Sequence, residues 1–278
     1  MLQERLEELV RRYSREYLET DPIRYPHRYS REEDIVVAGL LSALLAFGGV
    51  KQIFRSLDDL FRIIGPRPHD FVANLSRQDR KKFDGFSHRF VRGDDVYRLL
   101  AALSALCKEK GGIRGSIVSR HRKGKLVESV SSWVRSVKGA LPNPAEGLSF
   151  LLPDPAGGSA CKRLFLFMRW MVRRGDGIDF GIFREISPSE LVIPLDTHVA
   201  RISRLLGLTR RKTATLSTAL EVTESLRRFD PDDPVKFDFA LSRIGIVKGC
   251  RGVNSSACAD CLLRGYCIAS RAKEDEVP

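Results

Sequence analysis

The sequence lacks any apolar segment long enough to cross a membrane. Its longest apolar run, 35–47, has thirteen residues and contains a glycine and a serine. A helix that spans a hydrocarbon core of roughly 30 Å needs about 20 apolar residues. The first nineteen residues mix acidic and basic side chains and lack the apolar stretch of a secretory signal. We therefore expect a core helix at 35–47, a cytoplasmic location and no membrane partner.

Strand-like alternation, internal repeats and low-complexity segments are also missing. Apolar residues instead recur at helical spacing, in four clear groups: Leu2, Leu6, Leu9 and Tyr13; Ile53, Leu57, Leu60 and Ile64; Val96, Leu99, Leu103 and Leu106; Leu126, Val130, Trp133 and Val137. Glycines and prolines fall between these groups, where they favour turns. The pattern predicts an all-α protein with short connections and with further helices near 188–193, 197–206, 212–229 and 233–249.

Acidic residues are too few to balance the basic ones. The chain has 47 Lys and Arg against 35 Asp and Glu, a formal net charge of +12. Such an excess favours a polyanionic partner, with nucleic acid first, although solubility alone could account for it. Basic clusters stand at 77–82, 121–125, 173–174 and 210–212, and we assign none of them individually because a charge run is usually a solvated face.

Cysteine is scarce except at the C-terminus, where four of the six cysteines fall within eighteen residues. Cys250, Cys258, Cys261 and Cys267 follow the spacing Cys-x7-Cys-x2-Cys-x5-Cys. In a reducing compartment this pattern points to metal rather than to disulfides. Four thiolates suit zinc or an iron–sulfur cluster. The single tight pair favours iron–sulfur over zinc, since structural zinc sites typically use two such pairs.

The cysteine spacing, at the end of a basic all-α chain, resembles the cluster signature of the endonuclease III branch of the helix–hairpin–helix DNA glycosylases, with one extra residue in the first gap. The resemblance covers about 35–267. It implies a two-lobed helix–hairpin–helix fold with a C-terminal four-cysteine 4Fe-4S loop. It assigns 35–175 to a helical barrel lobe that ends in the hairpin, and 1–34 plus 176–278 to a second lobe. The family's cluster loop approaches DNA phosphates, and here Arg251 is its basic residue.

The segment Pro-Leu-Asp-Thr-His at 194–198 resembles the family's Val-Asp-Thr-His motif, whose aspartate lies at the active site. The resemblance makes Asp196 a catalytic residue. From the residues alone, Asp196 stands in N-cap position of a short amphipathic helix that Gly207 can end. Capping is a complete structural explanation, and both roles can hold at once. We expect His27 and His198 to be structural.

A lyase of this family also needs an amine, supplied by a lysine that opens the second helix of the hairpin motif. Here the sequence LLPDPAGGSACKRL at 151–164 is similar to a lengthened hairpin followed by an apolar helix over 164–172, and Lys162 stands at the matching place. By this resemblance Gly157, Gly158 and Arg163 approach DNA phosphates. A solvated or phosphate-binding Lys162 is the alternative. The long separation of Lys162 from Asp196 is like that of archaeal 8-oxoguanine glycosylases, which lack the cluster, so the chain resembles a divergent branch.

Two segments near the N-terminus carry weaker signals. Residues 37–47 resemble the family's Leu-Leu-Ser-Ala-Gln helix, with Leu44 in place of the glutamine that enters the duplex. Phe86 to Phe90 mixes aromatic rings with hydrogen-bond donors. We interpret it as a core pair of phenylalanines with His88 and Arg89 exposed, and a base pocket is the alternative.

These features together predict a bifunctional DNA glycosylase and AP lyase of base excision repair. The expected partner is double-stranded DNA with a damaged base, with 8-oxoguanine favoured over oxidised pyrimidines, and the expected form is a nucleoid-associated monomer. Lys162 would form a Schiff base with the deoxyribose, and Asp196 would stabilise the positive charge on the sugar. The alternatives are a monofunctional glycosylase that uses Asp196 only, and a non-catalytic iron–sulfur DNA-binding protein.

Overall fold

The computed structural model describes residues 1–141 and 146–271, and within these ranges the protein is mostly helical. The α-helices are α1 (Leu2–Arg12), α2 (Glu32–Leu44), α3 (Val50–Ile64), α4 (Pro68–Ala73), α5 (Gly93–Lys108), α6 (Gly112–Val118), α7 (Leu126–Gly139), α8 (Glu146–Leu151), α9 (Lys162–Val172), α10 (Thr197–Leu205), α11 (Leu216–Arg227), α12 (Asp238–Ile246) and α13 (Ile268–Arg271). Short 3₁₀ turns and one small hairpin, β1 (Ser87–His88) with β2 (Val91–Arg92), connect them. The predicted helical fold class is confirmed at this level.

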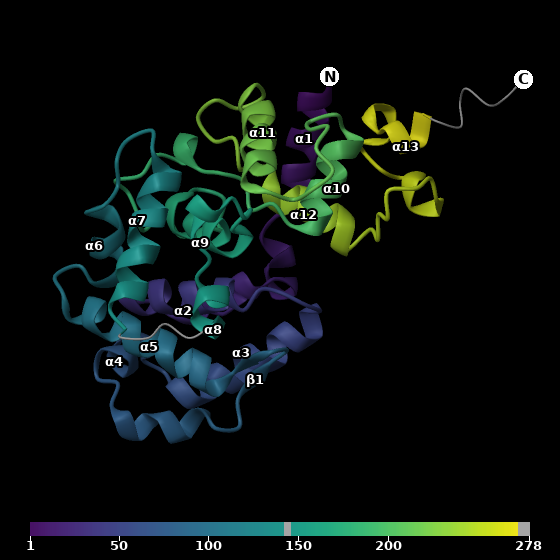
Figure 1. Cartoon of the computed structure of the whole chain (residues 1–278). Helices are drawn as coiled ribbons and strands as arrows, with labels where there is room; N and C mark the ends of the chain where they lie inside the picture. The colour runs from purple at the N-terminus through teal and green to yellow at the C-terminus, as the bar shows by residue number, and fades with distance from the viewer. Residues whose placement is uncertain (142–145, 272–278) are drawn as a thin grey trace, which may run out of the picture.

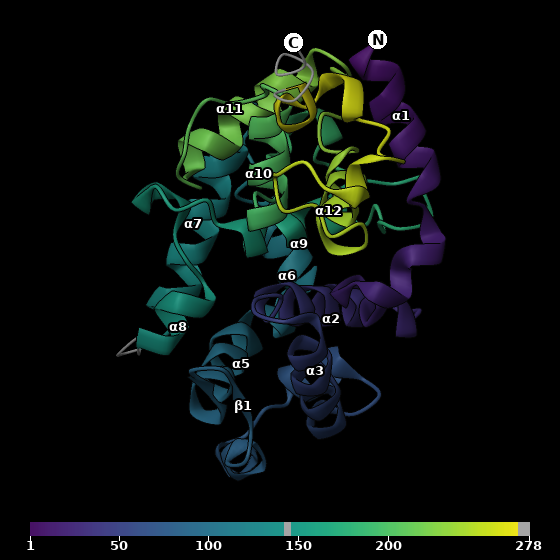
Figure 2. The same ribbon diagram turned by 90° about the vertical axis from the view of Figure 1, so that its right-hand side faces the viewer.

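The helices gather towards two ends of the molecule. Figures 1 and 2 show α2, α3, α4 and α5 at one end, α1, α10, α11 and α12 at the other, and α9 between them. No helix in the described ranges is long and apolar enough to cross a membrane. The division into lobes at 35–175 and at 1–34 plus 176–278 stays a prediction, and parts of both lobes, 142–145 and 272–278, lie outside the described residues.

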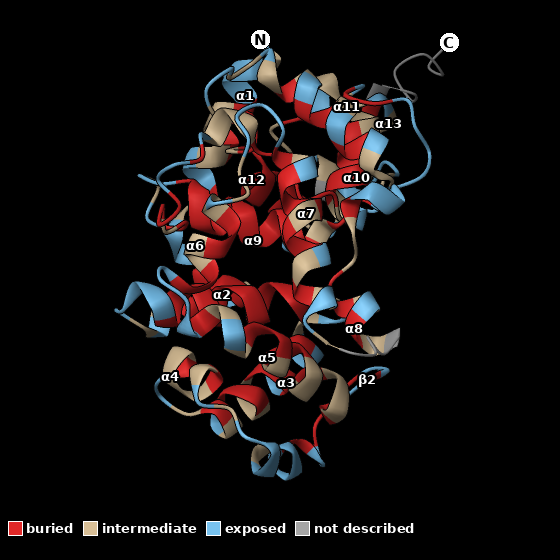
Figure 3. Ribbon diagram, turned by 60° about the vertical axis from the view of Figure 1, so that its left-hand side comes forward, coloured by how far each residue is buried: buried red, intermediate tan, exposed pale blue. Residues whose placement is uncertain are grey.

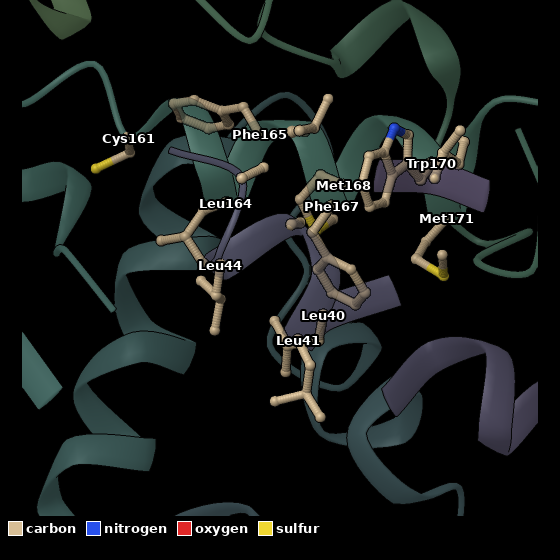
Figure 4. Packing of buried hydrophobic residues seen from close by; sticks show 14 of the residues in the cluster. Leu40, Leu41, Leu44, Cys161, Leu164, Phe165, Phe167, Met168, Trp170 and Met171 are labelled. Carbon is tan, nitrogen blue, oxygen red and sulfur yellow. The ribbon is translucent and has the colours of Figure 1, made fainter. Parts of the chain in front are cut away.

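The centre of the core is the contact between α2 and α9. Every residue of α2 from Asp34 to Leu44 is buried, as expected for a helix that is apolar on all sides. Leu40, Leu41 and Leu44 lie beside the α9 side chains in Figure 4, and Figure 3 shows both helices as buried. A Cβ at Gly39 would lie 2.8 Å from Cε of Met171. The glycine therefore lets α9 approach α2 closely.

Buried charges also connect the helices. Arg169 of α9 and Arg173, the residue just after this helix, are both buried and form ion pairs with four aspartates. Arg169 pairs with Asp179 and Asp238, and Arg173 pairs with Asp176, Asp179 and Asp233. Since a buried charge is costly unless it is paired, each of these groups depends on its partners. The network joins α9 to the loop that follows it and to the start of α12.

Three helix predictions need correction. A helix was expected near 188–193, but the chain forms only a 3₁₀ turn, η6 (Pro188–Glu190), and then runs extended to Asp196. Ser187 and Glu190 form a capping box at the start of this turn. The turn does not continue as a helix, because the amide of Ile193 donates to Oγ1 of Thr223 instead of to a helix carbonyl. Helices α11 and α12 are shorter than the predicted 212–229 and 233–249.

The interpretation of Phe86 to Phe90 was wrong in two positions. His88, expected to be exposed, is fully buried and its ring nitrogens lie 2.9 Å from Oγ of Ser56 and from the carbonyl oxygen of Phe47. Phe90, expected in the core, is 56% exposed. The segment forms a β-hairpin with Arg89 at φ 56°, and residues of a strand alternate between faces, which turns His88 inward. Phe86 is buried as expected.

Candidate active site

The hairpin between α8 and α9 brings Lys162 to the start of a buried helix. Asp154 caps a short 3₁₀ turn, η5 (Pro155–Gly157), by accepting a hydrogen bond from the amide of Ala156 at 2.9 Å. Gly158 follows in a left-handed conformation at φ 78°. Cys161 is also left-handed, at φ 42°, which is unfavourable for a residue with a side chain. Helix α9 then begins at Lys162, two residues before the predicted start at 164.

Both cationic residues at the start of α9 bind the end of α2. Lys162 Nζ donates to the carbonyl oxygen of Ala46 at 3.0 Å, and Arg163 donates to the carbonyl oxygens of Leu44, at 2.8 Å, and of Phe150. The C-terminal end of a helix carries partial negative charge, so it favours both cations. Arg163 is buried, and burial lowers the pKa of its guanidinium to about 10. Arg163, the predicted phosphate ligand, is thus a buried residue that binds two main-chain carbonyls, and its contact with phosphate stays a prediction.

Asp196 is the N-cap of α10, as the sequence predicted. Its Oδ1 accepts a hydrogen bond from the amide of Val199 at 2.7 Å. Gly207 lies just beyond the helix at φ 72°, in the left-handed conformation that commonly ends a helix. The side chain of Asp196 is half-buried. Capping occupies one carboxylate oxygen, and the other has no hydrogen bond within the described residues.

A cavity of about 670 Å³ brings Lys162 and Asp196 together. Its walls come from the end of α2, the hairpin, the segment before α10, and α12. Its lining includes Phe47, Phe150, Ser159, Lys162, Asp196, His198, Ala214, Asp238 and Arg243. The volume lies within the range typical of small-molecule sites in proteins. Two residues separated by 34 positions in the sequence therefore share one candidate site.

His198, which the sequence predicted to be structural, also lines this cavity. Its Nδ1 lies 3.0 Å from Nη2 of Arg201. A guanidinium group only donates, so Nδ1 accepts and a neutral ring carries its proton on Nε2. Burial lowers the pKa of His198, against the charge of Asp196, and the cations Arg201 and Lys162 lower it further. A Cβ at Gly245 would lie 2.2 Å from Nδ1 of His198, so the ring packs directly on the backbone of α12.

Asp238 and Arg243 contribute buried charges to the cavity lining, and sequence reasoning missed both. Asp238 accepts a hydrogen bond from Nη1 of Arg169 at 2.6 Å. Burial raises the pKa of Asp238 to about 6, against the effect of Arg169 and with a further rise from the Asp196 charge. Arg243 donates to Oδ2 of Asp21 at 2.7 Å. The only sequence signal was a charge inside an otherwise apolar helix.

The four C-terminal cysteines are half-buried in one loop region. Burial raises the pKa of the Cys261 thiol, and the charges of Cys250, Cys258 and Cys267 raise it further. Within residues 1–141 and 146–271, no three His, Cys, Asp or Glu side chains are grouped closely enough to hold a metal ion. Four soft sulfur donors nonetheless suit zinc or an iron–sulfur cluster chemically. The metal therefore stays a prediction.

Two contacts fix the start of this cysteine loop to the cavity side of the molecule. Arg201, which binds His198, also donates from Nη2 to the carbonyl oxygen of Cys250 at 2.7 Å. Gly252 has φ 85°, and a Cβ there would lie 3.0 Å from Cδ of Arg201. Arg251, the predicted phosphate ligand of the loop, is exposed.

The fold and the cavity define a helical protein with a charged site between the end of α2 and the start of α10 and α12. Residues 21–247 match a family model described as "Protein of unknown function (DUF2400)", and the chain therefore belongs to that family. No curated protein and no solved structure matches the chain. The matched span contains Lys162, Asp196, His198 and Asp238 and ends before Cys250.

Proposed function

We propose that the protein is a helix–hairpin–helix DNA glycosylase with AP lyase activity, which excises an oxidised base from double-stranded DNA. The observation that carries the proposal is the shared cavity of Lys162 and Asp196, with Lys162 as the first residue of the helix after the hairpin. The +12 charge supports a DNA partner. The long separation of Lys162 from Asp196 favours 8-oxoguanine over oxidised pyrimidines, and the protein acts as a monomer on the nucleoid.

In the proposed reaction, a damaged nucleotide leaves the duplex and enters the cavity. Lys162 releases the carbonyl of Ala46, loses a proton and attacks C1′ of the deoxyribose. The Nζ–C1′ bond forms as the bond between C1′ and the base breaks, and the electron pair leaves with the base. The sugar ring then opens: the C1′–O4′ bond breaks, O4′ takes up a proton, and the nitrogen lone pair forms the C1′=N bond of the Schiff base. Loss of a C2′ proton from this Schiff base expels the 3′ phosphate.

Two other cavity residues, Asp196 and His198, interact with the substrate during this reaction. Asp196, whose second carboxylate oxygen has no partner in the described part of the chain, stabilises positive charge on the sugar and can take the proton of the amine. Neutral His198 offers its Nε2 proton to the substrate as a hydrogen bond.

The cysteine loop has no role in this chemistry. Cys250, Cys258, Cys261 and Cys267 would hold a 4Fe-4S cluster, with zinc as the alternative, and the bound group would fix a Gly- and Ser-rich segment that has little core of its own.

Borohydride trapping tests the catalytic proposal. Duplexes that each carry one lesion are incubated with the protein and borohydride, and we expect a covalent complex with an oxidised purine. Lys162→Ala should abolish trapping, whereas Lys51→Ala, at an exposed lysine of α3 that does not line the cavity, should trap normally.

The products distinguish the alternatives. Base loss with strand breaks only after alkali would indicate a monofunctional glycosylase that uses Asp196. Retention of damaged DNA without any product would indicate a non-catalytic DNA-binding protein. Equal trapping by Lys162→Ala would show that another amine is the nucleophile.

A further inference from the structure

A basic loop lies directly beside the hairpin, although about 50 residues of sequence separate the two. Ser159 and Thr215 form an isolated antiparallel bridge, and the amide of Leu216 donates to the carbonyl oxygen of Gly158 at 2.9 Å. Ser159 and Ala214 both line the cavity. The bridge therefore holds the loop 207–215 at the edge of the cavity.

Several hydrogen bonds fix the backbone of this loop. Arg204 donates from Nη1 to the carbonyl oxygen of Lys212 at 3.0 Å, and Oγ1 of Thr218 donates to the carbonyl oxygen of Thr213 at 2.7 Å. Thr218 is fully buried in α11. The loop is thus attached to both α10 and α11.

The cationic side chains of the loop face solvent. Arg210, Arg211 and Lys212 are all exposed. Arg211 pairs with Glu221 at 2.6 Å, but within the described ranges neither Arg210 nor Lys212 has an ion pair. The loop whose Ala214 lines the cavity therefore carries two exposed cations, Arg210 and Lys212, that have no ion pair among the described residues.

We infer that the loop 207–215 and the Gly157–Gly158 turn form one surface that binds phosphates of the DNA backbone beside the cavity. The inference rests on the proposed function. Lysine and arginine contacts to phosphates set the register of a protein on a duplex without reading its sequence. The cysteine loop has only Arg251 between residues 251 and 257, so Arg210 and Lys212 supply charge that this loop lacks.

The salt dependence of DNA binding tests this surface. Affinity for a duplex with a non-cleavable abasic analogue is measured by fluorescence anisotropy over a range of salt concentrations. The slope of log affinity against log salt is negative, and each lost phosphate contact should reduce its magnitude by about 0.9. We therefore expect Lys212→Gln to weaken binding and to reduce the magnitude of the slope by about 0.9. The double variant Arg210→Gln with Lys212→Gln should reduce it by about 1.8.

Lys81→Gln is the matched control. Lys81 is an exposed lysine on η4 (Arg77–Phe83), it has no ion pair among the residues described, and it does not line the cavity. Its variant should keep the slope of the unmodified protein. An unchanged slope in Lys212→Gln, or an equal loss in Lys81→Gln, would overturn the inference. If the unmodified protein itself shows no salt-dependent binding to the duplex, the proposed function fails instead.

Discussion

At the scale of single residues, Asp196 has two roles that a pair of substitutions can separate. As the N-cap of α10 it accepts the amide hydrogen of Val199. Asparagine caps a helix about as well as aspartate, whereas alanine does not. The charge needed for the proposed chemistry is lost in both variants. The two substitutions at position 196 should therefore affect stability differently and activity alike.

We expect Asp196→Ala to lower the free energy of unfolding by about 1 kcal/mol and Asp196→Asn to leave it nearly unchanged. Both variants should lose base excision. Denaturant unfolding and single-turnover excision of a lesion measure the two effects. Full excision by Asp196→Asn would show that the carboxylate charge has no catalytic role.

A site residue could be predicted when the pattern that marks it lies in the neighbouring sequence. Asp196 and Lys162 stand beside recognisable short motifs, so their place at the start of helices could be predicted. Asp238 could not, because its partner Arg169 is 69 residues away and only the fold brings them together. The contact of His198 with Gly245 could not be predicted either, because it depends on the packing of α10 on α12.

At the scale of elements, the presence of the longer helices was predicted because their apolar periodicity extends over many residues, but the ends of α11 and α12 were not. The hairpin β1–β2 was missed, since strands of two residues are too short to show alternation. The predicted helix near 188–193 failed because apolar residues also occur in buried extended segments, as at Leu191 to Leu195.

The pairing of α9 with α12 predicts a pH dependence of stability. The pKa of Asp238 is raised from 3.8 to about 6 by burial in the folded protein. As pH rises from about 4 to 6, the unfolded chain therefore ionises this carboxyl before the folded protein does, which favours unfolding. The contribution of Asp238 to stability should fall across this window and stay constant above it.

Comparison with Asp238→Asn isolates this contribution. The stability of the unmodified protein relative to the variant should decrease as pH rises from about 4 to 6, as measured by denaturant unfolding at each pH. Asp233→Asn, at a carboxylate that pairs with Arg173 and does not line the cavity, provides a comparison within the same network. A pH-independent difference between the protein and Asp238→Asn would contradict the prediction.

At the scale of the whole molecule, Leu263 is the one buried hydrophobic side chain in the described part of the cysteine loop, with Cys250, Cys261 and Leu262 partly buried against the core. Arg201 also binds the carbonyl of Cys250. A segment with so little apolar burial gains stability from a bound metal.

We expect the protein purified without oxygen to contain iron and sulfide and to absorb visible light, as iron–sulfur proteins do and zinc proteins do not. Cys258→Ser should lose the metal and the absorption. Cys107→Ala, at a buried cysteine of α5 that is far from the cysteine loop in the sequence, should keep both. Elemental analysis with absorption spectroscopy makes the measurement. Zinc without iron would establish the alternative metal, and a metal-free protein with normal stability would exclude both.

The contact between Lys162 and the carbonyl of Ala46 limits what a comparison of related sequences can reveal. A main-chain oxygen is present whatever residue occupies position 46, so the hydrogen bond itself does not require alanine, although the burial of Ala46 limits the size of the side chain there. The number of residues from the buried part of α2 to position 46 is under constraint, because one residue inserted or deleted in this stretch would move the carbonyl away. Insertions there should be absent from functional relatives.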